Sequence, residues 1–316
     1  MKFLNNKIIL ITWWIGTIWW ALLDILIENK DIKQIRVIDN RETELAYAKD
    51  IYKDERIRFL FWDIRDKNRL KRAMDWVDIV YHAAAMKHVP ICEYNPIDAV
   101  YTNIIWTQNL IELALELNIE SFTYISTDKA VNPTNVMWAT KLIGERLIHS
   151  MFYYKWTSKT RFSAVRFWNV LWSRWSVLDI WKKQIKDNWK ITLTVPEMTR
   201  FFMEIKEAWK LVVKASELWK NWEIFILKMK AEKIKNLAIT FLKENWVNDN
   251  FEDRFEIIWR RPWEKMNEEL ILHWEEENLY ENDEMFCKIV NENYIPIWFI
   301  KSNTKKFCSD DYIKKW

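Results

Sequence analysis

The sequence predicts an α/β protein in which a doubly wound parallel sheet is followed by a smaller, partly interleaved C-terminal lobe. Two observations carry this prediction. Apolar runs and helical stretches alternate through the first half of the chain with a period of about 30 residues, which is typical of a parallel sheet covered on both faces. The first apolar run leads, within residues 7–26, through a turn into a helix with apolar periodicity, which is the arrangement of a nucleotide-binding fold.

The individual elements follow in chain order. Strands in the first half are predicted at the apolar runs 7–12, 34–39, 57–61, 78–82 and 121–126, and helices between them at 19–29, 41–53, 66–75 and 96–118. Past residue 170 the alternation loosens, and we predict helices at 176–187, 204–218 and 232–244 and strands at 190–194, 222–227 and 254–258. The acidic stretch 273–284 is interpreted as a solvated loop. The pattern divides the chain into a first domain at 1–172 and a second lobe with a charged tail at 173–316.

Composition and charge exclude several classes of function. The chain has 48 basic and 45 acidic residues and a net charge of +3, and no basic stripe recurs along it, so we expect no nucleic-acid partner. Its three cysteines have no metal-ligand spacing and form no disulfide framework, and we therefore predict no metal site. No apolar run reaches the length of a membrane span, so we expect a cytoplasmic protein without membrane insertion.

Tryptophan and glycine have unusual counts. The chain contains 23 Trp and 2 Gly, whereas a chain of this length should carry about 22 glycines. The tryptophans also stand at turn and cap positions, such as Trp62, Trp76 and Trp263, where a residue must adopt positive φ at low cost. We interpret most of them as glycines in the natural protein, which is the expected result when a UGA codon read by the organism as glycine is translated as tryptophan.

With glycine restored, the turn after the first strand becomes a phosphate-binding loop. Trp13, Gly16 and Trp19 then have the spacing G-x-x-G-x-x-G between a strand and a helix, where glycines allow a tight turn and a close approach to a pyrophosphate. Asp39, at the end of the second strand, is placed to accept a hydrogen bond from a ribose 2′-hydroxyl, which favours NAD. Arg41 could instead contact a 2′-phosphate, so NADP stays open.

Further residues at the ends of later strands suit the same cofactor. Asp63, in the stretch FWDIRD after the third strand, is expected beside the adenine. Ala83 and Ala84 follow the fourth strand in YHAAAMKH, and their small side chains let a cofactor pass close to the backbone.

The glycine spacing, the stretches FWDIRD and HAAA, and above all STDKAVNPTNVMWATK at 126–141 resemble one known family. They are similar to extended short-chain dehydrogenases/reductases, specifically the CapD-like nucleotide-sugar 4,6-dehydratases of polysaccharide biosynthesis. The resemblance runs from about residue 5 to residue 272. It implies a Rossmann-type fold, with an NAD(P)-binding domain at 1–172 and a nucleotide-sugar-binding lobe at 173–316.

The resemblance implies a catalytic cluster of Thr127, Asp128, Lys129, Met137 and Lys141. The reaction removes hydride from C4 of the sugar, takes the C5 proton, expels the C6 hydroxyl and returns hydride to C6. Lys129 would be the C5 base if its pKa is lowered, and Asp128 the acid for the leaving hydroxyl. Lys141 would hold the nicotinamide ribose. Met137 occupies the place of the usual tyrosine and cannot take a proton, which leaves the C4 base open and marks a branch of the family.

The resemblance also places residues around the nucleotide sugar. Paired arginines suit a diphosphate, and a carboxylate suits the uridine ribose. The expected substrate-binding residues are Lys87, Asn169, Ser173, Arg174, Thr199, Arg200, Arg261 and Glu264.

From these residues we predict a UDP-N-acetylglucosamine 4,6-dehydratase that makes a 4-keto-6-deoxy sugar for a surface glycan and works as a homo-oligomer. Two alternatives stay open. One is a UDP-sugar 4-epimerase, which shares the fold and cofactor but has no C6 hydroxyl to expel. The other is a non-catalytic nucleotide-sugar-binding protein. The stereochemical outcome at C5 is also left open by the residues.

Overall fold

The computed structural model describes residues 1–12, 17–154, 157–170, 177–218, 223–245, 250–289, 299–305 and 307–312. Trp13, Gly16, Ser173 and Arg174 therefore lie outside the described residues, and of Trp19 only the backbone is placed, in the first helix. Among the described residues, no helix combines the length and the apolar character needed to cross a membrane.

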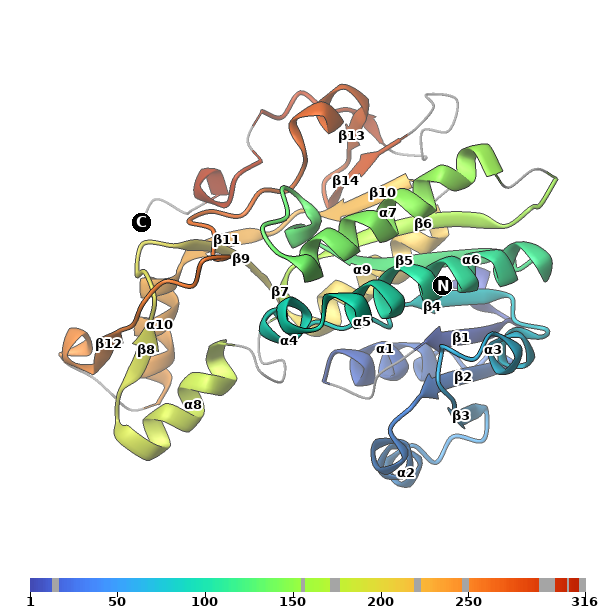
Figure 1. Ribbon diagram of the computed structural model, residues 1–316, viewed down its shortest axis with the longest axis horizontal. Coiled ribbons are helices and arrows are strands. Elements are labelled where there is room, and N and C mark those ends of the chain that lie inside the picture. The colour runs from blue at the N-terminus through green and yellow to red at the C-terminus, as the bar shows by residue number, and fades with distance from the viewer. Residues whose placement is uncertain are drawn as a thin grey trace.

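A large sheet forms the centre of the molecule (Figure 1). Seven of its strands run parallel in the order β3-β2-β1-β4-β5-β6-β10, which confirms the predicted doubly wound fold. The parallel strands are β1 (Ile8–Thr12), β2 (Gln34–Asp39), β3 (Ile57–Phe61), β4 (Ile79–His82), β5 (Ser121–Thr127), β6 (Arg161–Phe167) and β10 (Glu223–Leu227). Most of their apolar side chains are buried because helices cover both faces, whereas Phe61 on the edge strand β3 is exposed.

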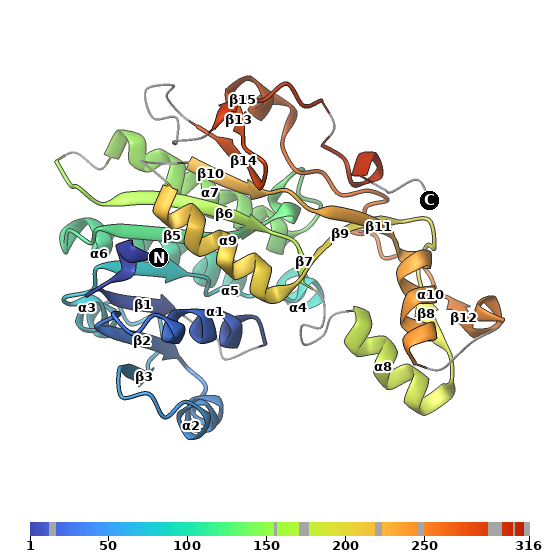
Figure 2. The ribbon, with the colours of Figure 1, turned by 180° about the vertical axis from the view of Figure 1, so that it is seen from behind.

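The helices form two layers. The helices α4 to α7 lie on the face shown in Figure 1, whereas α1 and α9 lie side by side on the opposite face in Figure 2. The segment predicted as one helix at 96–118 is three consecutive pieces, the middle one a π-helical turn. The helices around the sheet are α1 (Thr17–Glu28), α2 (Glu42–Ile51), α3 (Lys67–Met74), α4 (Val89–Tyr94), α5 (Pro96–Val100), η2 (Tyr101–Ile105), α6 (Trp106–Glu116), α7 (Val136–Tyr154) and α9 (Ile205–Leu218).

A smaller lobe lies beside the carboxyl ends of the parallel strands (Figures 1 and 2). Its own apolar cluster includes Trp181, Ile191 and Phe241. The lobe contains two short sheets, β11-β9-β7 and β12-β8. Its elements are β7 (Asn169–Val170), α8 (Val177–Asn188), β8 (Ile191–Leu193), β9 (Thr199–Met203), β11 (Lys230–Lys233), α10 (Ile234–Glu244) and β12 (Phe255–Ile257).

The C-terminal part returns to the large sheet. The strands β14 (Met285–Lys288), β13 (Leu279–Glu281) and β15 (Ile300–Lys301) extend it beyond β10 with antiparallel pairing. The described chain also contains the short 3₁₀ helices η1 (Lys2–Leu4), η3 (Asp128–Ala130), η4 (Phe251–Arg254), η5 (His273–Asn278) and η7 (Ser309–Tyr312). Residues after 173 supply strands to the large sheet as well as to the two short sheets, so the two lobes are interleaved. The domain boundary between residues 172 and 173 stays a prediction.

The interpretation of 273–284 as a solvated loop is wrong. Glu275, Leu279 and Tyr280 are buried. The carboxylate of Glu275 accepts hydrogen bonds of 2.8 and 2.9 Å from the guanidinium of Arg166, which also donates to Glu145 on α7. Arg166 is fully buried on β6. A buried charge is tolerated when it is paired in this way, so Glu275 anchors the acidic stretch to the sheet, although other residues of the stretch, such as His273 and Asp283, are exposed.

Candidate active site

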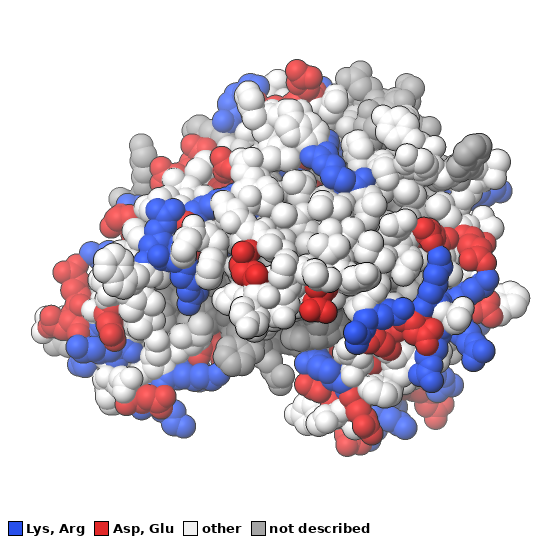
Figure 3. All heavy atoms as spheres, in the orientation of Figure 1, with Lys and Arg blue, Asp and Glu red and all other residues white. Residues whose placement is uncertain are grey.

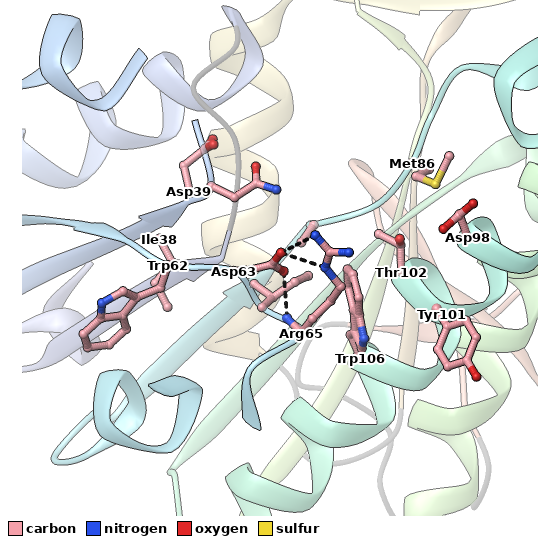
Figure 4. A pocket seen from close by; sticks show the side chains of 13 residues that line it. Ile38, Asp39, Trp62, Asp63, Arg65, Met86, Asp98, Tyr101, Thr102 and Trp106 are labelled. Atoms are coloured by element: carbon pink, nitrogen blue, oxygen red, sulfur yellow. Dashed lines mark hydrogen bonds and ion pairs between the residues drawn. The ribbon is translucent and has the colours of Figure 1, made fainter. Parts of the chain in front are cut away.

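A cavity of about 420 Å³ opens where β2, β3 and β4 end (Figure 4). Asp39 lies at the end of β2 and is almost fully buried. The backbone N–H of Arg41 donates to its Oδ1 at 2.8 Å, and the Arg41 guanidinium contacts the same carboxylate and Glu44. Asp39 thus lines the cavity, and Arg41 is engaged by two carboxylates.

The opposite wall of this cavity is formed after β3. Arg65 donates from Nε to Oδ2 of Asp63 at 2.7 Å and lies over the ring of Trp106 (Figure 4). Burial opposes ionisation of Asp63, but the hydrogen bonds from Arg65 outweigh it and lower the pKa of Asp63. Ala83 and Ala84 follow β4 and are buried, and Ala84 lines the cavity. Small side chains here leave the cavity open.

The predicted catalytic pair lies at the carboxyl end of β5. Thr127 caps η3, and its hydroxyl donates to Oδ1 of Asp128 at 2.8 Å. The Asp128 side chain is fully buried, and both of its oxygens accept hydrogen bonds from Nζ of Lys129, at 3.0 and 3.1 Å. Burial and the nearby negative charge of Glu268 raise the pKa of Asp128 to about 6. The structure therefore brings an acid and an amine into direct contact.

Glu268 is a member of this cluster that the sequence analysis missed. Its carboxylate lies 3.0 Å from Nζ of Lys129 and accepts hydrogen bonds from Nδ2 of Asn169. Burial lowers the pKa of a lysine, but attraction to Asp128 and Glu268 outweighs burial and raises the pKa of Lys129. The condition set for Lys129 as a free base, a lowered pKa, is therefore not met in the substrate-free protein.

Met137 and Lys141 lie four residues apart on α7. The thioether of Met137 packs in an apolar cluster with Cys92 and Ala99. Lys141 is buried, donates from Nζ to the carbonyl oxygen of Ile125 at 2.9 Å, and lies over the ring of Tyr124. Burial lowers the pKa of Lys141 to about 7. This amine therefore exchanges protons near neutral pH.

Two adjoining cavities, of about 480 and 370 Å³, lie between the catalytic pair and the smaller lobe. Four predicted substrate ligands line both of them: Lys87, Arg200, Arg261 and Glu264. Asn169 lines the larger cavity, whereas Asp128 and Lys129 line the smaller one. The two cavities thus bring together cations suited to a diphosphate and the acid–amine pair.

Thr199 is the exception among the predicted ligands. It is fully buried, and its hydroxyl contacts Ser309 and donates to Oδ1 of Asn267. It is absent from the lining of both described cavities. Its position does not support the expected contact with a substrate, because these internal partners already use its hydroxyl.

The loop after β4 reaches both the cavity at the ends of β2, β3 and β4 and the two cavities beside the catalytic pair. Met86 lines the first, and the next residue, Lys87, lines the other two. Buried Asn103 accepts a hydrogen bond from the Met86 N–H at 2.7 Å and donates to the Met86 carbonyl oxygen and to Thr140 on α7. Asn103 lies in the π-helical turn, a feature that often occurs at functional sites. The sequence carried no signal for this role.

Relatives of the chain act on nucleotide sugars or are named for polysaccharide synthesis. A UDP-N-acetylglucosamine 4,6-dehydratase (inverting) of Campylobacter jejuni is 39% identical over 74% of this chain and 70% of its own length. A UDP-glucose 4-epimerase of Rickettsia bellii is 36% identical over 74% of this chain and 69% of its own. The capsular polysaccharide biosynthesis protein CapD of Staphylococcus aureus is 46% identical over 66% of this chain, which spans only 35% of the length of CapD.

Full-length similarity comes from two further proteins. An uncharacterised membrane protein of Methanocaldococcus jannaschii is 48% identical over 99% of this chain and 96% of its own length. The crystal structure of Pen from Bacillus thuringiensis has a TM-score of 0.91 and 36% identity, covering 99% of this chain and 95% of Pen.

A more distant structure shares the fold. DesIV of Streptomyces venezuelae, a dTDP-glucose 4,6-dehydratase solved with NAD bound, has a TM-score of 0.70 at 18% identity, covering 82% of this chain and 86% of its own. The model of the polysaccharide biosynthesis protein family matches residues 9–290. The parallel sheet, the cavity at its carboxyl edge and this match lead to one conclusion: the chain belongs to the polysaccharide biosynthesis protein family.

Proposed function

We propose that the protein is an NAD-dependent UDP-N-acetylglucosamine 4,6-dehydratase. The observation that carries the proposal is the buried contact between Asp128 and Lys129 at the edge of a cavity lined by Arg200 and Arg261. An elimination needs an acid for the leaving hydroxyl and a base for the neighbouring proton at the same place. The 39% sequence identity with the UDP-N-acetylglucosamine 4,6-dehydratase of Campylobacter jejuni supports this choice of substrate.

NAD fits the cavity at the ends of β2, β3 and β4. Asp39 would accept from the ribose hydroxyls, Asp63 would lie by the adenine, and Ala83 and Ala84 leave room for the dinucleotide. Bound NAD would accept a hydride from C4 of the sugar and return it at C6. A 2′-phosphate would meet the buried carboxylate of Asp39, and Arg41 already pairs with that carboxylate and Glu44. These contacts favour NAD over NADP.

The acid and the base are both supplied by one ion pair. In the substrate-free protein Asp128 is the anion and Lys129 the cation at neutral pH, because the pKa of Asp128 is about 6 and that of Lys129 is raised. Transfer of one proton along their 3.0 Å contact produces a neutral carboxyl and a neutral amine. The Lys129 amine then takes the C5 proton, and the Asp128 carboxyl protonates the C6 hydroxyl as it leaves as water. When hydride is returned to C6, the Lys129 ammonium gives a proton back to C5, which completes the 4-keto-6-deoxy sugar.

Oxidation at C4 requires a group that accepts the hydroxyl proton. The thioether of Met137 cannot do so. Lys141 follows one helical turn later on the same face of α7, and burial lowers its pKa to about 7. We assign the proton to Nζ of Lys141, which would also hold the nicotinamide ribose.

The diphosphate and the nucleoside would occupy the larger cavity. Arg200 and Arg261 supply positive charge, and Glu264 supplies a carboxylate for the uridine ribose. Lys87 completes the cationic lining, and burial lowers its pKa.

A 4-epimerase is the second candidate, because a UDP-glucose 4-epimerase is 36% identical. The two activities differ in their products. Incubation of the protein with NAD and UDP-N-acetylglucosamine should yield a 4-keto-6-deoxy sugar, whose C6 methyl group is visible by proton NMR. Recovery of UDP-N-acetylgalactosamine with its C6 hydroxyl would favour the epimerase, and no product of either kind would favour a non-catalytic binding protein.

We also propose that most tryptophans are glycines in the natural protein. Two conformations support this: Trp76 and Trp189 have φ of 63° and 55°, and the other described residues of positive φ are all Asn. The indole N–H groups of Trp138 and Trp168 are buried without a hydrogen-bond partner among the described residues. Trp181 differs, because it is buried and its Nε1 donates to the carbonyl oxygen of Thr192 at 2.9 Å. We therefore expect Trp181 to be a genuine tryptophan.

A further inference from the structure

Glu268 stands apart from the other charged groups near the catalytic pair because its backbone is held on both sides. Its N–H donates to Oγ of Ser309 at 2.8 Å, and the Ser309 N–H donates to the Glu268 carbonyl oxygen at 2.7 Å. Ser309 is fully buried and also contacts Thr199 on β9. A C-terminal segment thus fixes the position of a residue that reaches the end of β5.

The Glu268 carboxylate is buried and surrounded by donors. It accepts from the backbone N–H of Phe201 at 3.2 Å and from Nδ2 of Asn169 at 3.0 and 3.2 Å. It lies 3.0 Å from Nζ of Lys129 and 3.5 Å from Nε of Arg200. A carboxylate with so many donors remains ionised when buried. Burial alone would raise the pKa of Glu268, but the positive charges of Lys129 and Arg200 outweigh burial and lower this pKa.

Lys129 consequently has a fixed place. Its ammonium lies between the carboxylates of Asp128 and Glu268 and also donates to Oδ1 of Asn169 at 3.1 Å. Without Glu268, Lys129 would keep Asp128 as its one anionic partner among the described residues. The other charged groups that face this cluster around the smaller cavity are Lys87 after β4, Arg200 from β9 and, from the segment after β12, Arg261, Glu264, Lys265 and Glu269.

We propose that Glu268 is a positioning residue, which holds the Lys129 amine against Asp128 and places a second negative charge beside that pair. This inference rests on the dehydratase function proposed above. Loss of the Glu268 charge removes an attraction from the Lys129 ammonium and a repulsion from the Asp128 carboxylate. Both groups should then release their protons at lower pH.

The first test needs no substrate. The pKa of Lys129 is measured by NMR on protein labelled with ¹⁵N-lysine, and its Nζ signal is assigned by its loss in Lys129→Arg. We expect Glu268→Gln to lower this pKa by about one pH unit or more, and Glu284→Gln, which removes an exposed carboxylate paired with Lys214, to leave it unchanged. An unchanged Lys129 pKa in Glu268→Gln would overturn the proposal.

The second test uses turnover of UDP-N-acetylglucosamine. The kcat of the wild-type protein should rise as the pH increases through about 6. Below this pH both Asp128 and Lys129 are protonated, and loss of the Asp128 proton leaves the single shared proton that the mechanism needs. Glu268→Gln should lower kcat by about 10-fold to 100-fold through misplacement of Lys129, leave KM nearly unchanged and move the rising limb to lower pH. Glu268→Asp, which keeps the charge, should recover part of kcat and keep the limb near its wild-type pH. A normal kcat and an unshifted limb in Glu268→Gln would contradict the proposal.

Two further outcomes can be distinguished from a failure of the proposal. If Glu268→Gln does not fold, Glu268→Ala, which also removes the charge, supplies the NMR test with the same expected decrease, and an unchanged Lys129 pKa there would overturn the proposal. If the wild-type protein does not turn over UDP-N-acetylglucosamine, the proposed function fails, whereas the Lys129 titration still decides whether Glu268 controls the charge of this amine.

Discussion

At the scale of single residues, Asp128 and Lys129 carry the proposed elimination. Their side chains contact each other at 3.0 Å, and the Asp128 side chain is fully buried. Asp128→Asn and Lys129→Ala should each lower kcat by about 10²-fold or more, because each removes a general acid or base. Binding of NAD, measured by calorimetry, should be nearly intact, and Glu284→Gln serves as the surface control. Wild-type rates in both variants would place the chemistry elsewhere.

Asp39 carries the preference between the two nicotinamide cofactors. It is buried at the end of β2 and pairs with Arg41. The wild-type protein should bind NAD more tightly than NADP, and Asp39→Ala should erode that preference by removing the acceptor for the 2′-hydroxyl and freeing Arg41. Asp50→Ala, on the exposed side of α2, is the matched control. Tighter binding of NADP to the wild-type protein would show that Arg41 governs the choice.

At the scale of the elements, the face formed by α4 to α7 carries few charged side chains (Figure 3). Ile97, Tyr101 and Ile105 recur every four residues along it and are 70%, 54% and 37% exposed. Other exposed apolar residues of these helices are Ile91, Tyr94, Val100 and Ile143. Exposed apolar residues gathered on one face favour an interface, and we expect this face to carry the homo-oligomer contact predicted from the sequence.

This interface is tested by sedimentation. The wild-type protein should form a dimer or a larger homo-oligomer, and Ile97→Glu should shift it toward the monomer because a charge would enter an apolar contact. Ile257→Glu changes another exposed isoleucine, on β12 in the smaller lobe, and should leave the assembly intact. A wild-type monomer at high concentration would refute the self-association.

The elements also show what local sequence can and cannot reveal. Strands β2 and β3 match their predicted bounds, because each is a short stretch rich in Ile, Val, Leu or Phe with a single internal arginine. Strand β6 and helix α7 were not predicted. Strand β6 contains Arg166, whose charge is neutralised by Glu145 and by Glu275, and the latter lies 109 residues away. No local pattern can contain such a partner.

The residues of the candidate site also differ in whether the sequence alone could reveal them. The Asp128–Lys129 pair and Lys141 lie in one continuous stretch and could be found by resemblance. Glu268 lies 139 positions further along the chain than Lys129, which it contacts. The next residue, Glu269, is also a glutamate, and no sequence pattern indicates which of the two is buried in the site. Only the folded chain distinguishes the buried carboxylate from its neighbour. The raised pKa of Lys129 follows from the same long-range contact.

At the scale of the whole molecule, the tryptophan content is itself testable. A gene that encodes tryptophan at all 23 positions should give an insoluble or unfolded protein. Overpacking costs about 1–3 kcal/mol per buried site, and indoles at positive φ add strain, against a usual stability of about 5–15 kcal/mol. A gene that encodes glycine at these positions, with Trp181 retained, should give a soluble protein that binds NAD.

Two results bear against this interpretation. A well-folded, active product from the tryptophan-encoding gene would refute both the glycine hypothesis and the phosphate-loop role of residues 13–19. Mass spectrometry of the native protein provides the independent check, because tryptic peptides that contain positions 76 and 189 differ in mass between the two residues. Indole at both positions would also refute the hypothesis.

In the proposed reaction, the hydrogen removed from C4 of the sugar is returned at C6. The most direct measurement uses UDP-N-acetylglucosamine that carries deuterium at C4, incubated with the protein and NAD and followed by NMR. A 4,6-dehydratase should deliver the deuterium to the C6 methyl group of a 4-keto product. Deuterium retained at C4 of newly formed UDP-N-acetylgalactosamine, which keeps its C6 hydroxyl, would contradict the dehydratase and assign the protein to the epimerases.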